Sequence, residues 1–387
     1  MQRVSFSVLR FSCTAVSATA SFDVSEAVTT SQQASDSASP DEARALIADL
    51  FRRSATIYWV DMLLSSGAAW ALTVLYFAAP AWSLVQIAAF VVAAVLFFRV
   101  GTFIHEIVHM PSTQMVWFKR AWNVLVGIPL LMPWIVYRNH TGHHNHTRFG
   151  TPADGEYLPL ASSPLIETLK YMVQAPLLPL FMLVRFGVLG PLSWLHSGLR
   201  EWVLTRASAA VSNPYYTRRF PERDEQHLLI VEALCFGYLA VIAGLLWQEV
   251  ISPWHFLMGY SLLAFTLGLN WFRNLAAHRY GNDGSRMTMD EQVADSINIT
   301  GQTWLTVALF PVGLRYHALH HMFPALPYHQ MGEAHRRLMA GLPADAPYRV
   351  ANRDSFFAAV AQLWRSASNT SPEHSSMRAW SQGAGRS

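Results

Sequence analysis

Four long apolar segments dominate the pattern of hydrophobic and polar positions along this chain. Each holds about 20 mostly apolar residues, the length that a helix needs to cross a bilayer. The segments are residues 57–79, 83–104, 228–250 and 254–275. Pro80-Ala81-Trp82 separates the first two, and Ile251-Ser252-Pro253 separates the last two. The pattern therefore predicts two hairpins of transmembrane helices, each with an uncharged turn.

Two further apolar segments, residues 121–137 and 169–195, are interrupted by proline, which breaks the hydrogen-bond ladder of a helix. If each of these two segments crossed the bilayer once, the histidine motifs described below would lie on both faces of the bilayer. We therefore expect interfacial or re-entrant segments. By the positive-inside rule, both termini and residues 105–227 are expected to be cytoplasmic. The basic residues behind this prediction are Arg52, Arg53, Lys119, Arg120, Arg138, Arg148, Arg218, Arg219 and Arg279.

Polar extensions flank the predicted membrane domain, which we place at residues 41–345. Residues 1–40 are rich in Ser, Thr and Ala, a composition typical of a disordered or targeting-like tail. Residues 41–53 have the pattern of a short amphipathic helix. Residues 346–387 are expected to form a cytoplasmic tail that is disordered from about residue 366.

Composition excludes several classes of protein. Only 14% of the 387 residues are charged, whereas an average soluble domain has about 25%, so a large water-soluble globule is excluded. Two cysteines rule out a disulfide framework and a cluster held by four cysteines. The net charge of +3 is too small to indicate a nucleic-acid partner.

Nine of the 16 histidines are grouped in three motifs and one outlier. The first motif, HEIVH, holds His105 and His109 at the end of the second predicted span. The second motif is HTGHH, and the third is HALHH. Their histidines are His140, His143, His144, His317, His320 and His321, and the outlier is His278, four residues after Asn274.

Helical spacing gives these motifs a chemical meaning. Residues at i and i+3 or i+4 share a helix face, whereas the side chains of adjacent residues point about 100° apart. The two adjacent histidines of an HxxHH motif therefore point in different directions, and one motif can serve two metal ions. Nine imidazoles also exceed the roughly six ligands that one octahedral ion takes. The predicted fold is therefore all-α and membrane-integral. Four transmembrane helices in two hairpins carry a cytoplasmic helical cap with a histidine-rich di-metal site.

Other polar residues near the motifs are candidates for supporting roles. Metal-bound histidines usually donate their second N–H to a carboxylate. The acids proposed for that role are Glu106, Asp154, Glu156 and Asp295, with His146 as a further outer-layer or solvent-facing candidate. Asn274 is a candidate ligand through a water molecule. We expect ordinary polar roles for His196, His227, His255, His329, His335 and His374.

Three histidine boxes on a four-span membrane protein resemble the membrane-bound fatty acid desaturase/hydroxylase superfamily. The resemblance covers roughly residues 55–345 and rests on HEIVH, HTGHH, RNLAAHRY and HALHHMFP. It implies two non-haem irons, O2 as co-substrate and all nine histidines as ligands. Asn274 and His278 match an Asn-x-x-x-His element of the stearoyl-CoA desaturase branch. The short spacing of the first box departs from the animal enzymes of that branch, so acyl-CoA is not assumed as the substrate.

The flanking stretches HTRFGTPADGEYLP and GLRYHALHHMFPALPYH look most like bacterial acyl desaturases. We therefore expect an acyl-lipid desaturase of unsaturated fatty acid biosynthesis in a bacterial inner membrane, with its active site cytoplasmic. Its substrate is an acyl-lipid, acyl-CoA or acyl-carrier. Hydroxylation of an acyl chain, alkane or terpenoid is the alternative, because both reactions begin with cleavage of the same kind of C–H bond. Electrons are expected from a ferredoxin or cytochrome b5-type donor with its reductase.

HEIVH also satisfies the HExxH motif of zinc metalloproteases, in which Glu106 would act as general base. A protease needs three protein ligands, which would leave most of the clustered histidines without a role. A metal transporter would instead place its ligands near the middle of the bilayer, whereas these histidines lie at the ends of the predicted spans. Both readings therefore remain remote alternatives.

Overall fold

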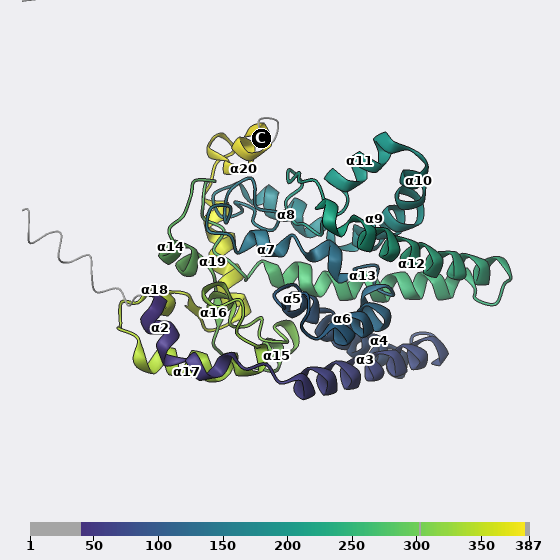
Figure 1. The fold of residues 1–387 in the computed structure, drawn as a ribbon, viewed down its shortest axis with the longest axis horizontal. Helices are drawn as coiled ribbons and strands as arrows, with labels where there is room; N and C mark the ends of the chain where they lie inside the picture. The colour runs from purple at the N-terminus through teal and green to yellow at the C-terminus, as the bar shows by residue number, and fades with distance from the viewer. Residues whose placement is uncertain (1–39, 302, 384–387) are drawn as a thin grey trace, which may run out of the picture. The chain divides into compact units, whose positions relative to one another are not determined.

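The computed structural model describes residues 40–301 and 303–383, so the tail predicted over residues 1–40 falls, apart from Pro40, outside the described residues. Helices make up nearly all the regular structure of this part of the chain (Figure 1). The one sheet described is a parallel pair, β1 (Asn298–Ile299) and β2 (Asn352–Arg353). The all-α membrane fold predicted from the sequence is confirmed.

All four predicted spans are continuous helices. They are α3 (Ala55–Ala78), α4 (Leu84–Gly101), α12 (Glu222–Trp247) and α13 (Pro253–Asn274). Serine side chains cap three of them: Ser54, Ser83 and Ser252 accept hydrogen bonds from the first free backbone N–H groups, which have no partner inside the helix. In Figure 1, α3 and α4 lie side by side, and α13 also packs against α4. Phe98, near the C-terminal end of α4, packs in one buried cluster with Ala276, which follows α13, so the C-terminal ends of these two helices lie close together.

Four helical stretches in the described residues are long and apolar enough to cross a membrane. They are Ala55–Ala78, Leu84–Val108, Leu165–Leu195 and Glu222–Trp247. Three coincide with predicted spans. The fourth, Leu165–Leu195, covers the segment predicted to be interfacial, and its prolines divide it into short helical pieces. Helix α13 has the required length, but Asn270, Arg273 and Asn274 make its C-terminal end polar.

The remaining elements are short. Before α12 they are α2 (Pro40–Leu46), η1 (Ala48–Phe51), α5 (Phe103–Val108), α6 (Val116–Trp122), η2 (Asn123–Gly127), η3 (Trp134–Tyr137), α7 (His140–His143), α8 (Leu165–Val173), η4 (Ala175–Leu177), α9 (Leu178–Val184), η5 (Arg185–Leu189), α10 (Gly190–Leu195) and α11 (Ser197–Arg206). After α13 they are α14 (Met289–Asp295), α15 (Trp304–Leu309), α16 (His317–Met322), η6 (Tyr328–Gln330), α17 (Met331–Gly341), α18 (Pro347–Val350), α19 (Phe356–Ser368), η7 (Pro372–His374) and α20 (Ser376–Gly383).

The C-terminal region corrects one expectation from the sequence. Disorder was expected from about residue 366, but α19 continues to Ser368 and α20 follows it. The reason is burial: Trp380 is only 1% exposed, and its ring lies 6.3 Å from that of Tyr157 between centroids. A few apolar side chains among many polar ones are therefore enough to attach this segment to the membrane domain.

Candidate metal centre

The nine histidines of the motifs converge in two groups. His105 and His109 are carried by α5 and its C-cap, while α7 and α16 carry the other two motifs and His278 follows α13. The first histidine group is His105, His109, His140, His144 and His320. The second histidine group is His143, His278, His317 and His321. In each group one nitrogen from every residue lies within 4.8 Å of those from the others.

Adjacent histidines of the two HxxHH motifs belong to different groups. His143 and His321 are in the second group, whereas His144 and His320 are in the first. Residues next to each other on a helix point in directions about 100° apart, so the helical backbone itself divides each motif. This arrangement provides two neighbouring sites rather than one, as the count of imidazoles predicted.

The nitrogen positions fit metal ions. In the first group, Nε2 of His144 lies 2.9 Å from that of His140 and 3.0 Å from that of His320. In the second group, Nε2 of His278 lies 3.1 Å from that of His143 and 3.0 Å from that of His317. Imidazole binds such ions at about 2.1 Å, so ligands at right angles lie about 3 Å apart. The donor atoms therefore suit two first-row transition-metal ions.

Unsatisfied nitrogens support the same fit. Nε2 of His105 and Nε2 of His109 are buried without a hydrogen-bond partner among the described residues. A buried polar atom without a partner costs free energy, and a bound metal ion would remove that penalty. Imidazole nitrogens that meet at about 3 Å are explained by metal binding and not by packing alone.

Acids lie behind three of these histidines, and two of them form hydrogen bonds with the ring. Nδ1 of His143 lies 2.8 Å from Asp154, and Nδ1 of His140 lies 2.9 Å from Glu156. Nδ1 of His278 instead forms its hydrogen bond with the hydroxyl of Ser296 at 3.3 Å, and Asp295 lies 3.4 Å from it. A carboxylate on Nδ1 leaves Nε2 as the free donor atom and fixes the ring orientation. Asp154, Glu156 and Asp295 thus lie beside imidazoles, and their support of metal ligands stays a prediction.

Asp154 is itself held rigidly. Its side chain is completely buried, and its oxygens accept hydrogen bonds from the backbone N–H groups of Gly150 at 3.1 Å and Glu156 at 2.9 Å. The positive φ of 69° at Gly150, which suits glycine because it has no Cβ, belongs to the turn that makes this contact. The loop after the second motif therefore fixes the position of His143.

Burial keeps most of the imidazoles in the form that binds metal. It lowers the pKa of His109, His140, His144, His278, His317, His320 and His321. Neutral imidazole is the metal ligand, so these residues need not lose a proton on binding. His143 differs: burial opposes its charge, but the carboxylates of Asp154, Glu156 and Asp295 together raise the pKa of His143.

Two of the proposed supporting residues lie elsewhere, and the role of Asn274 as a ligand through water stays a prediction. Glu106 accepts a hydrogen bond from the hydroxyl of Tyr58 rather than from an imidazole. His146 is exposed and belongs to neither histidine group. Asn274 lines a cavity beside the first group. The five histidines of the first group exceed the three protein ligands that a zinc protease needs, so the protease alternative does not suit this arrangement.

Several residues of the site were not identified from the sequence. The hydroxyl of Tyr137 donates to Glu156 at 2.9 Å and lies 3.1 Å from Nδ1 of His140. Asn298 accepts hydrogen bonds from the backbone N–H groups of Ala318 and Leu319 and so anchors α16. Tyr137 lies three residues before His140, and this short spacing in the sequence could have indicated that the two side chains are neighbours. No comparable signal marks Asn298, which reaches α16 through the fold.

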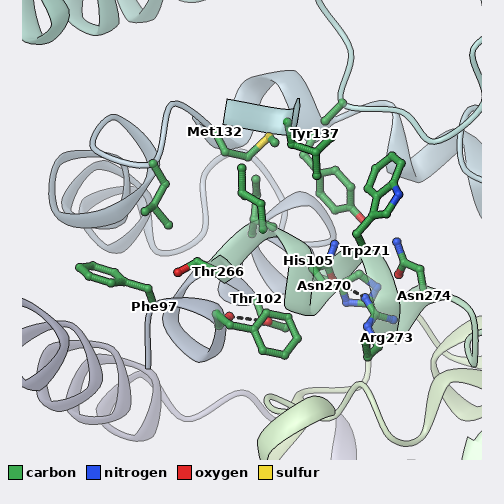
Figure 2. A pocket seen from close by; sticks show the side chains of 18 of the residues that line it. Phe97, Thr102, His105, Met132, Tyr137, Thr266, Asn270, Trp271, Arg273 and Asn274 are labelled. Carbon is green, nitrogen blue, oxygen red and sulfur yellow. Dashed lines mark hydrogen bonds between the residues drawn. The ribbon is translucent and has the colours of Figure 1, made fainter. Parts of the chain in front are cut away.

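An apolar cavity of about 160 Å³ opens beside the first histidine group. Figure 2 shows His105, Asn270, Arg273 and Asn274 together at one end of this cavity, with Phe97 at the other. Tyr137 and Glu156 also line it. The polar lining is thus concentrated at the histidine end, and the rest is mainly hydrocarbon.

A second apolar cavity adjoins the first. It has a volume of about 490 Å³ and lies among side chains of α3, α4, α9, α12 and α13. Phe97, Leu130 and Thr266 line both cavities, so they mark the junction between them. The two cavities together extend from His105 into the bundle of apolar helices.

The apolar helices and the paired histidine groups define a membrane protein with a candidate di-metal centre. The sequence matches the fatty acid desaturase family over residues 80–352. It is 37% identical to a ceramide hydroxylase of Caulobacter vibrioides (strain NA1000 / CB15N) over 335 residues, which are 86% of this chain and 95% of that protein. No solved structure matches the chain. The chain belongs to the fatty acid desaturase family of membrane oxidoreductases, as its histidine boxes predicted.

Proposed function

We propose that this chain is an O2-dependent hydroxylase of a ceramide-type lipid, with two irons held by the nine histidines. The observation that carries the proposal is the apolar cavity beside His105 and its continuation among the membrane helices. A cavity with mainly hydrocarbon walls suits a long alkyl chain. Similarity to the ceramide hydroxylase of Caulobacter vibrioides supports both the substrate class and the reaction.

Hydroxylation is proposed in place of the desaturation expected from the sequence. In the balanced reaction, one C–H bond becomes C–OH, the second atom of O2 leaves as water, and two electrons and two protons are consumed. Desaturation begins with the same C–H cleavage, so the position of the carbon chain at the site decides the outcome. The relative that hydroxylates ceramide therefore favours hydroxylation here.

The residues of this chain would hold the irons, position the lipid and exclude water. Bound iron would supply the oxidising power that an unactivated C–H bond requires. Asp154 and Glu156 hold the rings of His143 and His140 by hydrogen bonds to Nδ1, which leaves Nε2 of each ring free to bind a metal ion. Aliphatic and aromatic walls hold the alkyl chain in one path beside His105. A water-poor cavity limits side reactions of the oxidant.

Electrons for this reaction are proposed to come from a separate ferredoxin or cytochrome b5-type protein with its reductase. Two cysteines are too few for a cluster with four cysteine ligands. The basic residues of the inner side, such as Arg53 and Arg120, would attract an acidic donor. The same residues support a cytoplasmic location for the histidine groups and both termini, in a bacterial inner membrane.

The test is expression in a bacterial host supplied with ceramide, a ferredoxin and its reductase, followed by mass spectrometry of the lipids. A ceramide heavier by one oxygen atom is expected, and a product lighter by two hydrogen atoms would instead establish desaturation. His320→Ala should abolish the product and lower the iron content while the protein still inserts into the membrane. His374→Ala is the matched control, because His374 is exposed and outside both histidine groups.

A further inference from the structure

An arginine lies at the histidine end of the cavity, near the C-terminal end of the mainly apolar helix α13. Arg273 is only 6% exposed and lines the cavity. In the described part of the chain, no carboxylate forms an ion pair with it. A charged residue inside a membrane helix is energetically unfavourable and generally marks a functional site. The metal centre described above does not use Arg273.

The hydrogen bonds of Arg273 leave part of its guanidinium without a partner. Nη2 donates to Oδ1 of Asn270 at 2.7 Å, whereas Nε is buried and has no partner among the described residues. Arginine has five N–H donors and no acceptor. A group that satisfies it must therefore supply oxygen acceptors, and the open space of the cavity is where such a group would enter.

Helix periodicity directs these polar side chains to the same side. Asn270, Arg273 and Asn274 are spaced i, i+3 and i+4, so they share one face of α13. Figure 2 shows the three residues grouped beside His105, away from Phe97. The cavity thus has a polar end next to the first histidine group and an apolar end that continues into the second cavity.

We infer that Arg273, held by Asn270, binds the amide oxygen of a ceramide-type substrate and so sets which carbon is hydroxylated. This inference rests on the proposed function. The alkyl chain would extend from Arg273 past Phe97 and Thr266 into the second cavity. Because the polar group and His105 share one end of the cavity, the hydroxyl position is counted from the amide and not from the end of the chain. Chain length would then change affinity but not the position of the hydroxyl group.

The inference is tested with Arg273→Met, Arg273→Lys and the matched control Arg286→Met, in which the exposed Arg286 receives the same substitution. Each purified protein is placed in phosphatidylcholine nanodiscs, and binding of a fluorescent short-chain ceramide is titrated. Arg273→Met should raise the Kd about tenfold or more, the effect of losing one charge-assisted hydrogen bond. Arg273→Lys should be intermediate, and Arg286→Met should be unchanged.

Product analysis provides a second readout. The wild type should hydroxylate ceramides of different chain lengths at one position, whereas Arg273→Met should give several positions. Iron content equal to that of the wild type shows that a variant is folded, and if Arg273→Met fails this criterion the comparison rests on Arg273→Lys. Unchanged Kd and a single product position in a folded variant would overturn the inference.

The two proposals can fail separately. If the wild type hydroxylates ceramide and Arg273→Met does so equally well, the hydroxylase assignment stands and the role of Arg273 is wrong. If the wild type binds ceramide through Arg273 without hydroxylating it, the binding site stands and the proposed reaction is wrong. If the wild type binds a free fatty acid through Arg273 but no ceramide, the amide assignment is overturned.

Discussion

Asp154→Asn tests whether the carboxylate behind His143 controls metal binding. Asp154 is completely buried, and its oxygens lie 2.8 and 3.0 Å from Nδ1 of His143. They also accept hydrogen bonds from the backbone N–H groups of Gly150 and Glu156. Asparagine keeps the size of the side chain but removes its charge. Its NH2 group must then face at least one donor that previously met an oxygen.

Two effects of the substitution have expected magnitudes. Loss of the carboxylate behind a metal ligand reduces metal affinity by about 10- to 100-fold. A buried donor left without an acceptor costs about 1–3 kcal/mol of folding free energy. We therefore expect a Kd for iron that is higher by about one to two orders of magnitude, together with a lower melting temperature of the metal-free protein.

The assay is competition for iron with a chelator of known affinity, with thermal unfolding of the same preparations in parallel. Asp345→Asn is the matched control, because Asp345 is exposed and should affect neither measurement. Wild-type iron affinity in Asp154→Asn would refute the reasoning that the carboxylate supports the ligand. A lower melting temperature with unchanged affinity would leave Asp154 with a purely structural role.

Three further substitutions test the cavity, the acid response and the C-terminal helix. Thr266→Phe should narrow the junction of the two cavities and shift preference toward ceramides with shorter chains, measured by competition between lengths at unchanged iron content. Burial lowers the pKa of His335 to about 4, below that of the unfolded chain. Between about pH 6.5 and pH 4 the unfolded state therefore binds more protons than the folded state, and the melting temperature should fall as the pH is lowered over this range. The fall should be less steep in His335→Leu. Trp380→Ala should destabilise the protein by about 3–5 kcal/mol, measured by chemical unfolding; no change would mean that α20 contributes nothing to stability.

Local spacing explains why much of the site was predictable. The i, i+3 and i+4 positions within HTGHH and HALHH follow helix geometry, so the division of each motif between two groups was implied before any contact was known. The apolar lengths of α3, α4 and α12 likewise follow from the bilayer thickness. These are properties of single helices and need no tertiary information.

Partners across the fold were predictable only in part. Asp154, Glu156 and Asp295 were proposed as supporting acids, and each lies behind an imidazole. Glu106 is next to His105 in sequence, but its place on α5 directs it to Tyr58. Adjacent helix positions face different sides, so proximity in sequence did not translate into contact with a ring.

The sequence alone determined the class of the molecule: a membrane-embedded helical enzyme whose histidine motifs can hold two metal ions. Those features depend on chain-local quantities, namely hydrophobic length, helical period and residue type. The tertiary structure decided which histidines share a group, that α20 is ordered by the burial of Trp380, and that Arg273 lies at the polar end of a cavity. Each of these depends on contacts between segments far apart in the chain, which packing selects and local pattern does not encode.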